Sequence, residues 1–220
     1  MKEGKYMKRD YKALANKLER LRALDKKQEI FGSNYHNYLL NPKLSEQEVE
    51  EFEMKNGIVI PSEYRYFICE IGNGGSGPCY GLLPLTNYHE HYDNYIWEDE
   101  DLKKSYLRYS FPYTDKWEPR SNNEHDNYDV LKQSLSGTLA LSHEGCGYYT
   151  LLIVSGEERG NIWLDGMVSD QGMMPLIRNG NRLGFYEWYE NWLDNSILEV
   201  LKKKKNTKIF RVILNKFKRR

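Results

Sequence analysis

The stretch from Ile71 to Leu85, IGNGGSGPCYGLLPL, most constrains how this chain can fold. Five glycines and two prolines fall within its fifteen positions, so no regular helix can run through it. Glycine pairs such as Gly74-Gly75 permit positive φ and a close approach between backbones. No Gly-Lys-Ser/Thr follows, which excludes a phosphate loop of the Walker type. We predict a structural turn that joins a helix to the first strand of a sheet and binds no ligand.

Helical patterns precede this loop. Apolar residues recur every three or four positions from Tyr11 to Leu21, which predicts an amphipathic helix. Ser45 and Glu48 form a capping box that begins a second helix, and Gly57 is its predicted left-handed terminator. Pro61 opens a third helix in its first turn. The segment between the first two helices, from Phe31 to Pro42, mixes turn residues with aromatic ones, and we predict an ordered loop there.

Strand patterns follow the loop. Three runs rich in branched and aromatic residues, each bounded by glycine, predict strands at 138–142, 148–154 and 160–164. A final apolar stripe from Phe185 to Leu193 has the spacing of one buried helical face, so we expect a helix that covers the sheet.

The ordered blocks of this chain resemble one known family. The blocks are S-E-x-E-x-x-x-F-E, G-I-x-x-P-x-E-Y-R-x-F and G-N-G-G-x-G-P-x-Y-G-L-x-P-L, followed by G-C-G-Y-Y, G-N-I-W and F-Y-E-W-Y. Together they resemble the SUKH superfamily, the Smi/Knr-type domains. The matching residues, which the resemblance assigns a structural role, are Glu53, Gly57, Pro61, Tyr64, Gly74, Gly75, Tyr80, Gly81, Gly145, Gly147, Trp163 and Trp188.

The resemblance implies an α+β fold in a single domain, with a mixed, largely antiparallel sheet flanked by helices. It sets the expected boundaries: a helical extension over 1–43, the SUKH-like domain over 44–195 and a basic tail over 196–220. Many bacterial members are implied to be immunity proteins that neutralise polymorphic toxins, which predicts a cognate toxin as partner. The alternative that the resemblance leaves open is a regulatory scaffold in a cellular assembly.

The charge of the chain is unevenly distributed. Lys and Arg total 32, as do Asp and Glu, yet the last twenty residues hold ten basic side chains and no acidic one. This basic tail carries apolar residues on one helical face, which is typical of helices that bind anionic membranes or nucleic acid. Docking on the acidic body of the same chain is the interpretation we favour. We do not expect the rest of the chain to bind nucleic acid.

The segment 86–129 is the predicted partner surface, because it has the densest mixture of acidic and aromatic residues and no core assignment. Its candidate binding residues are Trp97, Glu98, Asp99, Glu100, Asp101 and Trp117. Acidic side chains would speed the encounter with a basic, nuclease-like toxin, and tryptophans would anchor it. The opposing interpretation is a solvated insertion whose aromatic rings fold back onto the body.

Catalytic, cofactor and metal sites are not expected. Cys146 and His143 lie three residues apart, but no third group is evident to orient them. His89 and His91 lack the four well-spaced ligands that structural zinc sites use. Three cysteines without a C-x-x-C pair, no apolar leader and no long apolar run predict a reduced, cytoplasmic protein without a membrane span. The sequence thus predicts a non-enzymatic binding protein, with its oligomeric state left open.

Overall fold

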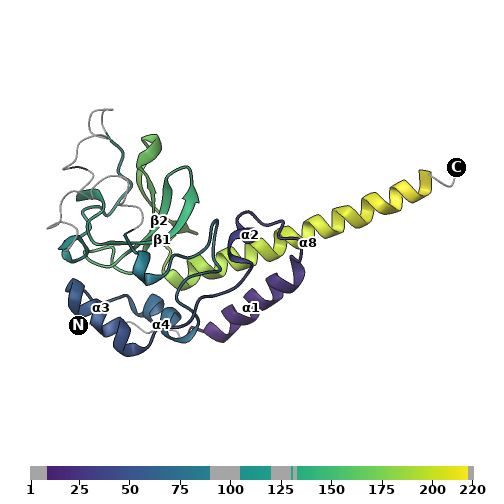
Figure 1. The fold of residues 1–220 in the computed structure, drawn as a ribbon. Helices are drawn as coiled ribbons and strands as arrows, with labels where there is room; N and C mark the ends of the chain where they lie inside the picture. The colour runs from purple at the N-terminus through teal and green to yellow at the C-terminus, as the bar shows by residue number, and fades with distance from the viewer. Residues whose placement is uncertain (1–8, 90–104, 120–129, 131–132, 218–220) are drawn as a thin grey trace.

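The computed structural model describes residues 9–89, 105–119, 130 and 133–217, with side chains up to residue 206. It confirms the predicted α+β fold in a single domain, with an antiparallel sheet and flanking helices. Figure 1 shows the helices gathered on one side of the sheet, with the first half of α8 beside α1.

The sheet has the order β1-β2-β3-β4, and all its pairs are antiparallel. Its strands are β1 (Thr138–Gly145), β2 (Tyr148–Ile153), β3 (Ile162–Gly166) and β4 (Gly172–Pro175). The three predicted strands are confirmed. β4 and the small hairpin of β5 (Ile177–Arg178) and β6 (Asn181–Arg182) were not predicted.

The first helix, α1 (Tyr11–Leu24), begins at Asp10, whose carboxylate accepts the amide hydrogen of Ala13. Its apolar stripe is buried, as its spacing predicts. At the edge of this stripe, the ammonium of Lys17 lies 2.8 Å from a carboxylate oxygen of both Glu190 and Asp194 in α8. α1 is therefore fixed along α8 by apolar contact and by these ion pairs.

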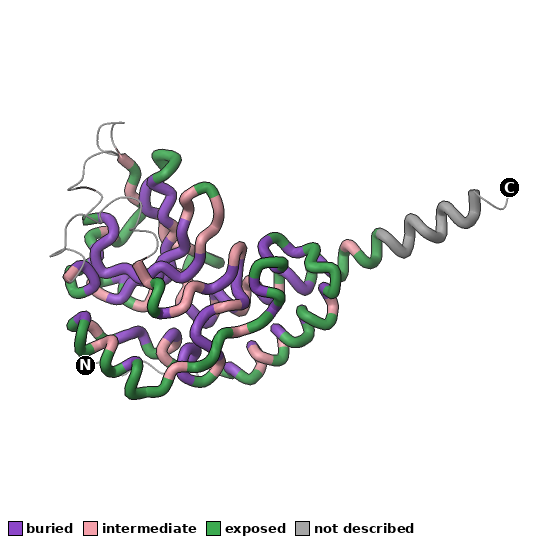
Figure 2. Tube along the Cα trace, viewed as in Figure 1, coloured by how far each residue is buried: buried purple, intermediate pink, exposed green. Residues whose placement is uncertain are grey.

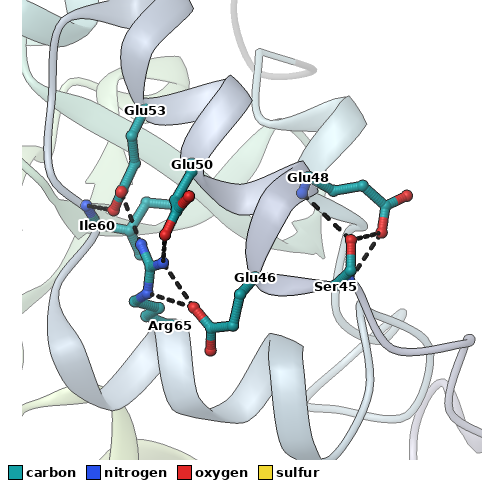
Figure 3. A network of polar contacts seen from close by, with 7 residues as sticks. All are labelled: Ser45, Glu46, Glu48, Glu50, Glu53, Ile60 and Arg65. Atoms are coloured by element: carbon teal, nitrogen blue, oxygen red, sulfur yellow. Dashed lines mark hydrogen bonds and ion pairs between the residues drawn. The ribbon is translucent and has the colours of Figure 1, made fainter.

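The helices α3 (Glu46–Asn56) and α4 (Ser62–Glu70) form a hairpin in which Arg65 of α4 bonds to the carboxylates of Glu46 and Glu53 in α3. The capping box of Ser45 and Glu48 begins α3 (Figure 3), and Gly57 ends it with a φ of 64°. Glu53 accepts the amide hydrogen of Ile60 at 2.7 Å and a guanidinium hydrogen of Arg65 at 2.6 Å. The single side chain thus links α3, the connecting turn and α4.

The last helix, α8 (Phe185–Phe217), is much longer than the predicted stripe. Its first half supplies buried rings at Phe185 and Tyr189, which contact Phe67 of α4 at centroid distances of 5.0 and 4.9 Å. Burial continues to Val200, beyond residue 195, where we predicted the domain to end. Farther on, the helix extends away from the domain (Figure 1), whereas the first part of the tail that we expected to dock on the body contacts it, through residues such as Val200 and Lys203.

We expect Glu53→Ala to lower the free energy of unfolding by about 2 kcal/mol, because it leaves the buried amide of Ile60 without an acceptor and removes a partner of Arg65. Urea denaturation measures this loss. Glu50→Ala is the matched control, since Glu50 also faces Arg65 but is 63% exposed and 3.8 Å away. Equal losses for the two variants would contradict the linking role of Glu53.

Candidate protein-binding surface

The glycine loop, residues 72–82, is hydrogen-bonded on both of its sides. Gly75 and Leu82 exchange their backbone hydrogen bonds at 2.8 and 2.7 Å, which closes the loop. On one side, the amide of Ser76 donates to the carbonyl of Leu39, and on the other, the amide of Leu83 donates to Leu141 of β1. The loop is therefore a fixed element between the segment near Leu39 and the edge of the sheet.

Glycine is required where this loop approaches its neighbours. Gly74 and Gly75 have φ values of 86° and 96°, in the left-handed region that disfavours other residues. A Cβ at Gly75 would lie 2.5 Å from the carbonyl oxygen of Leu39, and one at Gly74 would lie 2.7 Å from the amide nitrogen of Pro84. The predicted close approach of backbones is present at both positions.

Rings from three elements meet at this loop and form what we call the aromatic row: Phe31, Tyr35, Tyr80 and His143. Tyr80 of the glycine loop contacts Phe31 and Tyr35 edge-on, at centroid distances of 5.3 and 4.8 Å. On its other side, it stacks with His143 of β1 at 5.5 Å, and His143 stacks on the buried Tyr149 of β2 at 4.8 Å.

The outer end of the row faces solvent. Phe31 is 61% exposed and Tyr35 is 66% exposed, whereas Tyr80 and His143 are half-buried. In Figure 2, exposed and buried residues alternate along this segment, while the glycine loop is mostly buried. Rings that are exposed at one end and supported at the other resemble the aromatic anchors of protein interfaces.

The segment that carries Phe31 and Tyr35 is fixed by polar contacts. Its centre is a short helix, α2 (Ser33–His36), in a region predicted as a loop. Asp25 accepts the amide hydrogens of Glu29 and Ile30 and the phenolic hydrogen of Tyr38. These hydrogen bonds hold the pKa of the Asp25 carboxyl below its usual value despite its burial.

Backbone strain is concentrated beside the aromatic row. Seven described residues other than glycine have positive φ, and five of them lie in or next to the elements of the row: Gln28, Asn37, Tyr38, Cys79 and Cys146. Such conformations cost free energy and persist where the surrounding structure enforces them, which is frequent at binding and catalytic sites. The surrounding structure therefore holds the backbone next to the aromatic row in these conformations.

Comparison with protein families identifies the chain. A model of the SMI1 / KNR4 family (SUKH-1) matches residues 43–193. The chain belongs to the SMI1/KNR4 family. Searches of curated proteins and of solved structures found no match. In this SMI1/KNR4 chain, the aromatic row combines residues from inside and outside the matched region, because Phe31 and Tyr35 precede it.

The residues of the family motif lie in the core and at tight turns. Tyr64, Trp163 and Trp188 are buried, and the indole nitrogen of Trp163 donates to Glu158. Pro61 is the N-cap of α4, one position before the predicted first turn. The motif glycines in turns with positive φ are Gly57, Gly74, Gly75, Gly81, Gly145 and Gly147. A Cβ on Gly145 would lie 3.3 Å from the ring of Tyr80, so this glycine gives the aromatic row room.

The predicted partner segment is only partly described. Trp97, Glu98, Asp99, Glu100 and Asp101 lie outside the described residues. Trp117 is half-buried, stacks on Tyr113 at 5.0 Å and pairs through its backbone with Met173 of β4. Sequence reasoning did not select Phe31 and Tyr35, because aromatic residues mixed with turn residues carry no periodicity that indicates exposure.

The candidate chemical groups have other contacts or face solvent. His143 stacks between Tyr80 and Tyr149, while Cys146 is exposed at the β1–β2 turn. The thiol of Cys79 donates to Glu144, and burial raises the pKa of this thiol to about 12. Within the part of the chain that the structure describes, no three metal-binding side chains are placed to share an ion, and no helix is long and apolar enough to cross a membrane. His91 lies outside that part.

His36, which follows Tyr35 in α2, is a buried histidine. It is 8% exposed, accepts the amide hydrogen of Tyr38 at 3.1 Å, and contacts the ring of Trp192. Burial lowers its pKa from 6.5 to about 4. The neutral ring is thus the form that the fold accommodates.

We expect Gly75→Ala to lower the free energy of unfolding by about 3 kcal/mol, from the positive φ and the clash with Leu39 together. Gly160→Ala is the matched control, because Gly160 has a φ of 95° and open space around its missing Cβ. The control variant measures the loss of unfolding free energy caused by the positive φ alone, which we expect to be about 1 kcal/mol. Thermal or urea unfolding measures both, and equal losses would contradict the close approach.

We expect protonation of His36 to destabilise the fold as the pH falls from 6.5 towards 4, by about 3 kcal/mol over the whole window. As the pH falls, the imidazole of the unfolded chain is protonated before that of the folded protein. The contribution of neutral His36 to the free energy of unfolding is therefore fully present above pH 6.5 and is lost as the pH falls towards 4. The measurement is the difference in unfolding free energy between the wild type and His36→Gln at several pH values. The variant His143→Gln is the control. If the difference between the wild type and His36→Gln does not change with pH, the assignment of this pH dependence to His36 is wrong.

Proposed function

We propose that this SMI1/KNR4 protein is an immunity protein that neutralises a toxin, nuclease-like in activity, by direct contact and without catalysis. The observation that carries the proposal is the aromatic row, whose outer rings are exposed while its inner rings are fixed in the domain. Membership of the family supports it, because the resemblance implies immunity proteins among the bacterial members.

The row suits tight binding for a physical reason. Ordering flexible side chains and loops on association opposes binding, and a surface that is ordered beforehand avoids much of this cost. Here the backbone hydrogen bonds of the glycine loop and the carboxylate of Asp25 hold the elements that carry the rings. A toxin that buries Phe31 and Tyr35 would therefore gain the burial of two large rings at little entropic cost.

The acidic run Glu98, Asp99, Glu100 and Asp101 remains a second predicted contribution. Its charges would speed the encounter with basic regions of the toxin, and salt would weaken this effect. In this proposal, the run affects mainly the association rate, and the aromatic row affects mainly the dissociation rate.

A regulatory scaffold is the second candidate, and the length of α8 favours it. At about 1.5 Å per residue, its 33 residues span about 50 Å, which is more than the domain needs for its own packing. Gene context discriminates between the candidates, because a toxin gene beside this gene is expected of an immunity protein and not of a scaffold.

We expect Phe31→Ala and Tyr35→Ala each to weaken binding of the toxin encoded by the neighbouring gene by about 2 kcal/mol, or about 30-fold, through faster dissociation. Surface plasmon resonance measures both rates. Met54→Ala and Val59→Ala are the controls, since these side chains are equally exposed but lie in the last turn of α3 and in the turn that follows it, outside the row.

Protection of cells against the toxin should fall with the same two variants. Wild-type binding by both variants, with unfolding free energies unchanged, would contradict the row as the binding surface. If no neighbouring toxin is bound or neutralised at all, the proposed function itself is wrong.

A further inference from the structure

A group of lysines, which we call the lysine end, lies beside the exposed end of the aromatic row. Its members come from the turn after α1 and from α8, and all but the half-buried Lys203 are exposed: Lys26, Lys27, Lys202, Lys203, Lys204 and Lys205. The exposed acidic residues between them are Glu29 and Glu199. The buried Asp25 adds a third carboxylate, and the six lysines still outnumber these three acidic residues near the start of the row at Phe31.

A direct contact joins the two parts of the lysine end. The ammonium of Lys203 donates to the backbone carbonyl of Glu29 at 3.1 Å and lies 2.6 Å from the carboxylate of Glu199. Glu29 is two residues from Phe31, in the turn that Asp25 organises. Lys203 of α8 is thus brought to the same turn as Lys26 and Lys27, and that turn leads directly into the row.

The opposite end of the row has the opposite charge. Glu144, next to His143 in β1, is half-buried and accepts hydrogen bonds from Cys79 and Thr150. A polyanion with evenly spaced phosphates would meet this carboxylate if it followed the row, whereas nucleic-acid grooves keep positive charge along their length. Peptide segments, in contrast, can place their charges at one end only.

From this arrangement we propose that the aromatic row and the lysine end together bind an acidic segment of a partner protein. An aromatic or large apolar side chain of that segment packs on Phe31 and Tyr35, and its carboxylates lie against Lys26, Lys27 and Lys203. The inference rests on the proposed function only in taking the row as a protein-binding surface. It names the chemistry of the contact, which the proposed function leaves open.

The test uses the full chain and defined probes, and needs no toxin. Isotope-labelled protein is titrated in NMR experiments with the peptide Asp-Glu-Asp-Trp-Glu-Asp-Glu, and separately with its uncharged counterpart Asn-Gln-Asn-Trp-Gln-Asn-Gln. A fluorescent fifteen-residue oligothymidylate tests nucleic acid. We expect the acidic peptide to shift the signals of residues 26–35, to bind about tenfold more tightly than the uncharged peptide, and to weaken as salt is raised.

Charge reversal locates the site. The triple variant Lys26→Glu, Lys27→Glu, Lys203→Glu should lose about tenfold or more in affinity for the acidic peptide, whereas Tyr35→Ala should weaken both peptides equally. The matched control reverses Lys12, Lys43 and Lys55, which are outside the lysine end. Unfolding curves establish that every variant is folded.

Three outcomes would overturn the proposal: equal binding of the two peptides, signal shifts confined to other surfaces, or tighter binding of the oligothymidylate at the same residues. Failure of toxin binding with peptide binding intact would refute the proposed function and leave this inference standing. If the triple variant binds the toxin like the wild type and the acidic peptide does not bind, this inference is refuted and the proposed function stands.

Discussion

The aromatic row depends on direct contact between backbones in the glycine loop. Gly75 hydrogen-bonds to Leu82 across the loop and lies so close to Leu39 that no side chain fits between them. This contact ties the segment that carries Phe31 and Tyr35 to the loop that carries Tyr80, and the loop is in turn tied to β1. Exposed rings gain little from their own packing, so their positions must be set by the backbone beneath them.

Local chemistry explains which parts of the fold were predictable. The capping box at Ser45, the terminator at Gly57 and the buried stripes of α1, α4 and α8 are all encoded within one or two helical turns. β4 escaped prediction because its four residues, which pair with β3, are too few to show a clear alternation. Four residues are also too few for α2 to show a helical period.

The candidate surface was less predictable, because residue type does not reveal exposure. Trp117, chosen from composition, stacks on Tyr113 and is half-buried, while the less conspicuous Tyr35 is among the exposed aromatic residues. The row exists only when Phe31, Tyr80 and His143 are brought together from three elements. Such a juxtaposition is a property of tertiary structure, and no periodicity within one segment reports it.

The distribution of charge adds direction to this surface. The chain has no net charge, yet Lys26, Lys27 and Lys203 lie by the turn at one end of the aromatic row and Glu144 lies at the other. Apolar contact alone has no preferred orientation, so a partner could lie along the rings in either sense. Opposite charges at the two ends make one orientation favourable and the reverse unfavourable, because like charges then meet. Since the contact of Lys203 with Glu29 holds α8 against the turn that begins the row, the packing of the last helix also determines this polarity.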